Sequence, residues 1–219
     1  MYCSQLISSE ITPLGIYDTA GAALRQMEEF MVEFLPVTAE EKYLGLIDKE
    51  ALLEQPGENS ILTLHDSFVK PFVKGNDYFL LAVKQCHTFY VDIMPVVNDK
   101  NELEGVVTRD TLFHQLSHLI GVGQHGSLIV LEIENKDYSL GEINRLVESN
   151  DAMITQLNTW FDPTSPYHSV VLRINKEEVS DTVTTFQRHG FTVKYFLGEE
   201  LYRNELQNNL EHLMNYLNI

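Results

Sequence analysis

The feature that most constrains the fold is a repeat, offset by 59 residues, within the first half of the chain. Residues 35–53 read LPVTAEEKYLGLIDKEALL, and residues 94–113 read MPVVNDKNELEGVVTRDTLF. An apolar residue, Pro-Val, a polar turn, Gly and two branched apolar residues recur in the same order. The alignment of 18–37 with 77–96 needs no gap. Internal repeats of this length indicate a duplicated supersecondary unit whose copies pack together.

Within each copy the spacing of apolar residues changes from helical to extended and back. In residues 18–31 the apolar residues Ala22, Ala23, Met27 and Phe30 have helical spacing, and Asp18 or Thr19 is placed to cap that helix. Residues 34–38 and 43–47 are short apolar runs around a polar turn, which predicts a pair of strands. A second helix follows, so each copy is expected to contain a helix, two strands and a helix after a short extended piece.

This duplicated pattern resembles the tandem CBS-domain pair, or Bateman module, over residues 1–120, with copies at about 1–56 and 57–120. The resemblance implies two units packed sheet to sheet, clefts that commonly bind adenosine nucleotides, and pairing of modules into dimers. Nucleotide-binding members typically carry Gly, two apolar residues, Thr or Ser, two residues and then Asp. The Asp accepts hydrogen bonds from both ribose hydroxyls, which needs a carboxylate.

The second copy keeps part of that motif. Thr108 holds the hydroxyl position, but Thr111 stands in place of the Asp, and Asp110 is one residue early. One residue is about 100° of rotation on a helix, so the Asp110 carboxylate points elsewhere. Arg109 is placed to meet a phosphate. The predicted site for AMP, ATP or S-adenosylmethionine therefore consists of Ile93, Pro95, Thr108, Arg109 and Asp110.

The first copy departs further from the motif. Asp48 holds the hydroxyl position, where its charge would repel a phosphate, and Ala51 holds the ribose position. Asp48 is also a good helix N-cap, and we interpret it as one. These departures leave open the alternative that the ligand clefts are degenerate and that the chain is a constitutive dimerisation scaffold.

The second half predicts a separate domain after a linker at 121–126. Residues 127–198 alternate as strand, helix, strand, strand, helix and strand, which is the ferredoxin-like split motif. Ser139 and Glu142 form a capping-box pattern for the first helix, whose predicted core stripe is Leu140, Ile143, Leu146 and Val147. Asn175 and Glu178 are expected to open the second helix, and His189-Gly190 to close it.

This order resembles an ACT domain, a small-molecule regulatory module. Family members that bind amino acids carry Asp-x-Pro-Gly-x-Leu after the first strand; here the candidate ligand loop consists of Asn135, Asp137 and Tyr138. Asp137 stands at the Pro position and Tyr138 at the Gly position, where a bulky residue is unfavourable if φ must be positive. The departure favours docking or dimerisation over amino-acid binding. A C-terminal helix is expected at 199–219, with Leu206, Leu210, Leu213 and Leu217 on one side.

Composition excludes several classes of function. The net charge of −17 disfavours nucleic acid and anionic membrane surfaces as partners. No apolar run is long enough for a membrane span. The two cysteines are too few for a disulfide framework or a zinc site, so a reducing cytoplasm is expected. His114 and His118 are interpreted as a polar helix end rather than a metal site.

No hydrolase, zinc-protease or P-loop motif is present. The GVGQHG at 121–126 matches a dinucleotide fingerprint, but it follows a helical pattern and precedes a strand, which is the wrong order. Nearly the full chain resembles CBS–ACT proteins of the acetoin-utilisation accessory type. We therefore expect an α+β protein that is a non-catalytic, ligand-sensing regulator, forms a homodimer and signals to an unidentified protein.

Overall fold

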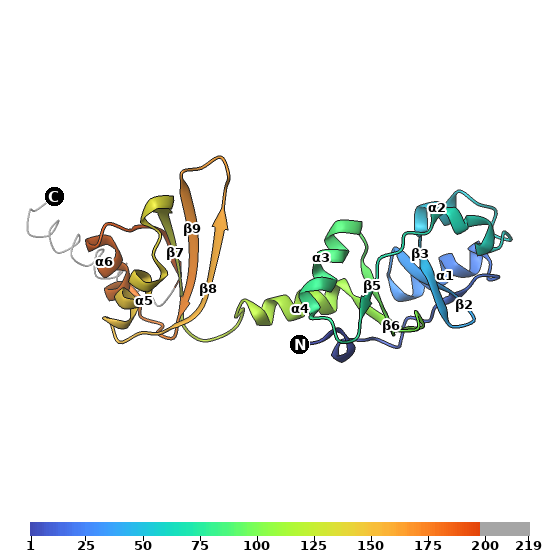
Figure 1. The fold of residues 1–219 in the computed structure, drawn as a ribbon, viewed down its shortest axis with the longest axis horizontal. Helices are drawn as coiled ribbons and strands as arrows, with labels where there is room; N and C mark the ends of the chain where they lie inside the picture. The colour runs from blue at the N-terminus through green and yellow to red at the C-terminus, as the bar shows by residue number, and fades with distance from the viewer. Residues whose placement is uncertain (198–219) are drawn as a thin grey trace, which may run out of the picture. The chain divides into compact units, whose positions relative to one another are not determined.

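The computed structural model describes residues 1–197, which form an α+β protein divided into two compact units at the Leu119–Ile120 boundary (Figure 1). The helix predicted at 199–219 lies outside the described residues. Among the residues that are described, no helix has the length and apolar character needed to cross a membrane.

Both copies in the first unit contain the predicted elements in the predicted order. The first copy contains β1 (Leu14–Gly15), α1 (Ala20–Phe30), β2 (Phe34–Ala39), β3 (Lys42–Asp48) and α2 (Lys49–Leu53). The second contains β4 (Val73–Lys74), α3 (Phe79–Phe89), β5 (Ile93–Val97), β6 (Leu103–Thr108) and α4 (Arg109–Leu119). Each copy builds a three-stranded sheet, in the orders β1-β2-β3 and β4-β5-β6. Short 3-10 turns, η1 (Cys3–Gln5) and η2 (Ile61–Ser67), precede them.

The repeat extends to individual hydrogen bonds. Asp18 and Asp77 each accept a hydrogen bond from the backbone N–H three residues earlier, at 2.7 Å in both copies. The helices that follow both end at a residue with left-handed backbone, Met31 in α1 and Tyr90 in α3. Of the two predicted caps for α1, Thr19 is the one whose side chain caps the helix.

The leading segments of the two copies are exchanged. Ser8, from the segment before β1, pairs with Val106 in β6 of the second copy. Val69, from the equivalent segment before β4, pairs with Leu46 in β3 of the first copy. In Figure 1 the N-terminal segment accordingly lies beside β6 and α4. The copies of the sequence repeat, 1–56 and 57–120, are therefore not the two lobes of the structure, since each lobe is completed by the other copy's leading segment.

The repeated glycine of the motif makes this exchange sterically possible. Gly45 (φ +154°) and Gly105 (φ +148°) have positive φ and face the incoming segments. A Cβ on Gly45 would lie 2.7 Å from Cβ of Phe68, and one on Gly105 would overlap the Cγ2 atom of Ile7. Both positions therefore need glycine for backbone conformation and for close approach.

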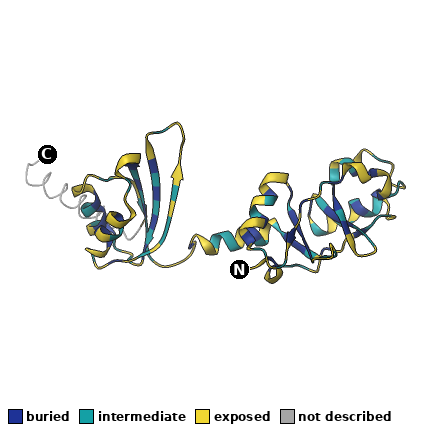
Figure 2. Cartoon of the chain, viewed as in Figure 1, coloured by how far each residue is buried: buried dark blue, intermediate teal, exposed yellow. Residues whose placement is uncertain are grey.

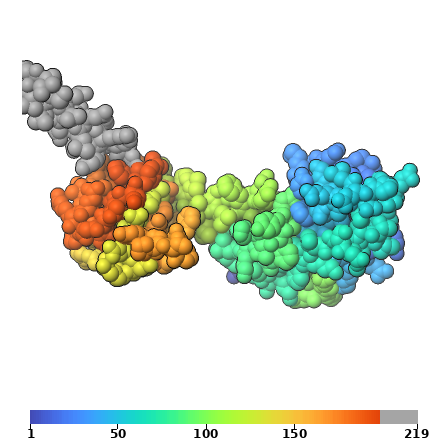
Figure 3. Space-filling view, turned by 90° about the horizontal axis from the view of Figure 1, so that it is seen from above, coloured from blue at the N-terminus to red at the C-terminus, as the bar shows by residue number. Residues whose placement is uncertain are grey.

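The two copies share one hydrophobic core. Its buried residues come from strands and helices of both copies, including Leu35, Ile47, Ile93, Met94 and Val107. In the burial view the first unit's strands are mostly dark blue or teal (Figure 2), and in the space-filling view residues 1–119 form one continuous body, coloured blue to yellow-green (Figure 3). The first unit is thus a single folded domain and not two independently packed copies.

The second unit contains β7 (Ser127–Glu134), η3 (Asn135–Asp137), α5 (Leu140–Glu148), β8 (Ile154–Phe161), β9 (Tyr167–Ile174), α6 (Ser180–Arg188) and β10 (Thr192–Leu197). Its sheet is antiparallel with the order β10-β7-β9-β8, which confirms the predicted ferredoxin-like arrangement. Alternate residues of β7 and β9 are buried with the apolar sides of α5 and α6 in a second core.

Two details of this unit differ from the sequence predictions. Leu140 is 50% exposed instead of buried, because it is the first residue of α5 and precedes the part of the helix that packs on the sheet. Helix α6 begins at Ser180 and not near Asn175. The side chain of Asn175 instead accepts a hydrogen bond from the Met153 N–H at 2.8 Å, which ties the end of β9 to the start of β8. The predicted cap of α5 by Ser139 is confirmed.

Candidate functional site

The residues predicted to bind a nucleotide lie at the junction of β5, β6 and α4. Ile93 and Thr108 are direct partners across β5 and β6, and Pro95 is two residues further along β5. Ile93 and Pro95 are buried, Thr108 is half-buried, and Arg109 and Asp110 are exposed in the first turn of α4. The structure therefore groups the polar members of the set at a helix start, with the apolar members in the sheet.

The hydroxyl groups at this junction already have hydrogen-bond partners. Thr108 Oγ1 accepts from the Thr111 N–H at 3.2 Å and lies 3.0 Å from Thr111 Oγ1, so it caps α4. In the first copy, Asp48 Oδ1 accepts from the Ala51 N–H at 2.5 Å, which confirms its predicted role as the cap of α2. A phosphate at Thr108 must share or replace these capping bonds.

Asp92, which immediately precedes β5, links the two copies next to this junction. One carboxylate oxygen accepts from the Glu33 N–H at 2.7 Å, and its backbone carbonyl accepts from the Arg109 N–H at 2.7 Å. Its other carboxylate oxygen, Oδ1, is buried with no hydrogen-bond partner in the described part of the chain. Desolvation raises the pKa of Asp92, although the Glu33 N–H and the Arg109 charge oppose the shift.

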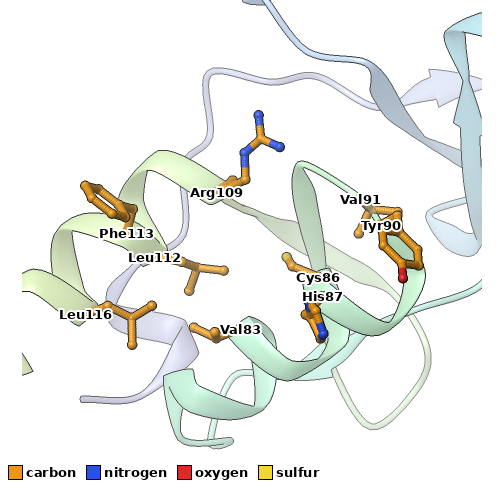
Figure 4. A pocket seen from close by; sticks show the side chains of 9 residues that line it. All are labelled: Val83, Cys86, His87, Tyr90, Val91, Arg109, Leu112, Phe113 and Leu116. Carbon is orange, nitrogen blue, oxygen red and sulfur yellow. The ribbon is translucent and has the colours of Figure 1, made fainter.

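A cavity of about 350 Å³ lies between α3 and α4. Figure 4 shows the side chains of Val83, Cys86 and Tyr90 on one side and those of Leu112 and Phe113 on the other, with Arg109 at the edge. Of the predicted nucleotide-binding residues, Arg109 alone is among those lining it. This cavity was not predicted from the sequence; its one signal was the pair of apolar neighbours Leu112 and Phe113, which cannot both face the same core.

The Cys86 thiol in this cavity is not a nucleophile at neutral pH. Burial raises its pKa to about 11, and the nearby Asp92 charge adds to the shift while Arg109 opposes it. A thiol with that pKa is almost wholly protonated, and the thiolate is the reactive form. The cavity therefore offers a mostly apolar surface with one cationic edge.

The candidate ligand loop of the second unit does not converge on one point. Asn135 and Asp137 lie in the short η3 turn, and Asp137 lines a polar hollow of about 500 Å³. Tyr138 has an ordinary φ of −68°, so the turn needs no positive φ there. Its ring instead stacks on that of His168, with centroids 5.8 Å apart. The loop thus differs from a glycine turn that brings backbone N–H groups to a ligand.

The described residues contain no group of three or more His, Cys, Asp or Glu side chains arranged to hold a metal ion. The rings of His114 and His118 meet edge to face, with centroids 4.5 Å apart. The segment 121–126 lies between α4 and β7, so it follows a helix and precedes a strand.

Similarity to curated proteins is limited in extent. No family model matches the chain. A homoserine O-acetyltransferase from Methanobrevibacter ruminantium is 31% identical over 118 residues, covering 52% of this chain and 23% of that protein. The chain spans less than a quarter of that relative's length, so the match assigns it no acetyltransferase activity.

The fold is that of a solved structure that contains a CBS-domain pair. A CBS domain pair/ACT domain protein from Thermotoga maritima has a TM-score of 0.50 and 19% identity, covering 55% of this chain and 99% of that one. The CBS domains of a transcriptional regulator from Streptococcus pneumoniae (TM-score 0.47, 17% identity, 52% and 98% covered) and a CBS domain-containing protein from Bacillus anthracis (0.44, 19%, 54% and 94%) are also similar. The duplicated first unit has the fold of a CBS-domain pair. The ACT-like and acetoin-utilisation resemblances stay predictions.

Proposed function

We propose that this chain is a non-catalytic regulatory protein that binds a small molecule in its CBS pair and signals to a partner protein. The observation that carries the proposal is the exchange of leading segments, in which Ser8 pairs with the second copy and Val69 with the first. Each lobe is built partly from the other copy. A ligand that shifts one lobe therefore changes contacts in both, so its binding can be transmitted beyond its own site.

The proposed ligand is an adenosine nucleotide, AMP or ATP, or S-adenosylmethionine, held beside Thr108, Arg109 and Asp110. The exposed Arg109 guanidinium stands at the N-terminus of the eleven-residue α4, where the helix dipole also favours an anion. Arg109 is a local positive charge within an overall net charge of −17, and it shares its turn with the carboxylate of Asp110. Thr108, at the hydroxyl position of the motif, supplies a group that can donate to a phosphate oxygen.

Calorimetry of the full chain with AMP, ATP and S-adenosylmethionine tests this site. We expect Arg109→Gln to weaken nucleotide binding about tenfold, the equivalent of about 1.4 kcal/mol. Thr111→Asp should strengthen it, because a carboxylate there can accept from both ribose hydroxyls, whereas the matched Thr111→Asn should not. Arg145→Gln, in α5 of the second unit, is the control. Absence of heat with all three ligands at about 1 mM contradicts the proposal.

A constitutive dimerisation scaffold is the second candidate function. It is favoured by the capping roles of Thr108 and Asp48, which already engage the groups at both phosphate positions. Thermal unfolding distinguishes the two candidates, since a ligand at 100 times its Kd stabilises a folded protein by about 2.7 kcal/mol. A sensor shows a raised Tm with at least one metabolite. A scaffold shows none, while its dimer persists.

For the second unit we propose an ACT-like role in docking or dimerisation, based on its ferredoxin-like sheet. We further propose that the protein acts as a homodimer in the cytoplasm, consistent with the free, buried thiols of Cys3 and Cys86. Affinity capture from cell extract with the full chain, compared with residues 1–119 alone, tests whether the second unit recruits the regulated partner. Equal capture by both contradicts a docking role.

A further inference from the structure

The second unit leaves one face of its sheet uncovered by α5 and α6. On β9 the residues His168, Val170 and Leu172 are buried beneath these helices, so Ser169 lies on the opposite face. Register pairs Ser169 with Glu132 on one side and with Trp160 on the other. The three side chains therefore form a row across three strands. Trp160 is 74% exposed, which is unusual for this large aromatic side chain.

A hollow of about 290 Å³ lies at this row, next to the turn that joins β8 and β9. Its lining consists of two aromatic rings, two carboxylates and two hydroxyls: Trp160, Tyr167, Glu132, Asp162, Ser165 and Ser169. The volume is close to the lower end of that found for small-molecule sites. The composition is one that favours cations, because aromatic faces carry negative potential and the carboxylates carry full negative charge.

The turn is held in place by its own hydrogen bonds. Asp162 Oδ1 accepts from the Thr164 N–H at 2.8 Å and from the Thr164 hydroxyl at 2.7 Å, and Ser165 Oγ accepts from the Tyr167 N–H at 3.1 Å. The Thr164 hydrogen bonds lower the pKa of Asp162, so this carboxyl group is ionised at neutral pH. The anionic group beside Trp160 is thus fixed before any ligand arrives.

Lysine charges near the hollow are paired with carboxylates of β7. Lys194 binds Glu132 at 2.9 Å, and Lys136 binds Glu134 at 2.8 Å. Glu134 is the register partner of Tyr167, so it adds a further carboxylate on this face. Each of these ion pairs has no net charge. The charge of Asp162 therefore makes the surroundings of Trp160 negative overall.

We propose that this hollow binds a small organic ammonium ion, a protonated amine or a quaternary ammonium, over the Trp160 ring. A cation against tryptophan is the strongest of the cation–aromatic pairs, and such contacts gain further when the cation is partly desolvated. Asp162 supplies the opposite charge, while an anionic ligand is repelled. The site lies wholly in the second unit, so the inference goes beyond the proposed function and does not depend on nucleotide binding to the CBS pair.

Trp160 is the single tryptophan of the chain, so its fluorescence reports this site directly. We expect choline to change the fluorescence of the full chain saturably, with a Kd on the order of 1 mM. The neutral isostere 3,3-dimethyl-1-butanol matches choline in shape without the charge, and it should bind at least about tenfold more weakly. Equal responses to the two probes, or no saturable response to choline, overturns the proposal.

Two substitutions distinguish binding of choline in the hollow from non-specific attraction of a cation to an acidic protein. Asp162→Asn keeps an acceptor for the Thr164 N–H but loses the charge, and it should weaken choline binding about tenfold. Asp181→Asn, which removes an exposed charge from α6 on the covered side of the sheet, should leave it unchanged. Circular dichroism confirms that each variant is folded. Calorimetry with Trp160→Leu, which has no ring, should show binding abolished; retained binding, or equal effects of the two Asp variants, overturns the site.

Discussion

Gly105 illustrates how one residue can determine the assembly of the two lobes. We expect Gly105→Ala to lower the free energy of unfolding by about 1–3 kcal/mol, because the new Cβ meets Ile7 at a positive φ. Urea unfolding followed by far-UV circular dichroism measures the change. Gly57→Ala is the matched control, since its nearest contact would be an ordinary 3.8 Å, and it should be neutral or stabilising by up to about 1 kcal/mol. Equal losses in both contradict the steric argument.

Asp92 gives the stability of the protein a predictable dependence on pH. Desolvation raises its pKa above the ordinary value of 3.8, so the folded state holds this proton more tightly than the unfolded state. Stability from this group is therefore full at low pH and is lost as pH rises through the interval between 3.8 and the raised folded pKa. Asp92→Asn removes that loss. The urea midpoint of unfolding, measured at several pH values, should rise for the variant relative to the wild type as pH increases. A difference between the two midpoints that does not change with pH contradicts the prediction.

Among the elements, the exchanged leading segment offers the clearest test. Deleting residues 1–8 removes Cys3 and Leu6 from the core and leaves β6 without its pairing partner at Ser8. Because loss of one buried leucine side chain costs about 2–5 kcal/mol, the second lobe should open more often. Cys86 is then the remaining thiol, and its labelling should speed up at least about tenfold.

The reference for this measurement is full-length Cys3→Ala, which also retains Cys86 alone. Labelling with a thiol reagent in the absence of denaturant compares the two proteins directly. Equal rates would show that residues 1–8 are not needed to close the second lobe.

The helices and strands could be predicted because their signals are local. Apolar spacing and capping residues such as Thr19 and Ser139 depend on neighbours within one turn, and the structure retains them. The exchange could not be predicted in this way. The pairing of Ser8 with Val106 joins distant segments, and the same 59-residue repeat fits lobes with or without exchange.

The candidate site was predictable to the same extent. Thr108, Arg109 and Asp110 are consecutive, so their grouping at a helix start follows from sequence. The hydrogen bonding of the two hydroxyl groups could not be predicted from the sequence. The 3.0 Å contact between Thr108 Oγ1 and Thr111 Oγ1 depends on the side-chain rotamers. The cavity between α3 and α4 was missed for a different reason, namely that the packing of two helices is tertiary information.

At the scale of the whole molecule, exposed apolar residues recur at equivalent positions of the two copies. Tyr90 (84% exposed) and Phe113 (71%) stand at the α3–α4 cavity, and their counterparts Met31 (90%) and Leu53 (64%) occupy the same places by α1 and α2. Large apolar groups exposed together mark interaction surfaces. A two-fold contact with a second copy uses the same surface on both chains and can cover such a patch on each of them.

We therefore expect the protein to be a dimer through this surface and Phe113→Glu to make it a monomer, because a buried, unpaired carboxylate at an apolar interface is costly. Size-exclusion chromatography with light scattering measures the mass. Tyr17→Glu is the control, since Tyr17 is 80% exposed but lies outside the four equivalent positions, and it should leave the dimer intact. A wild-type monomer at every concentration tested, or dissociation by both variants, contradicts this assignment.

Phe113 is four residues from Arg109 on α4, so dimerisation and nucleotide binding should also influence each other. Phe113→Glu should therefore change the nucleotide Kd that calorimetry measures.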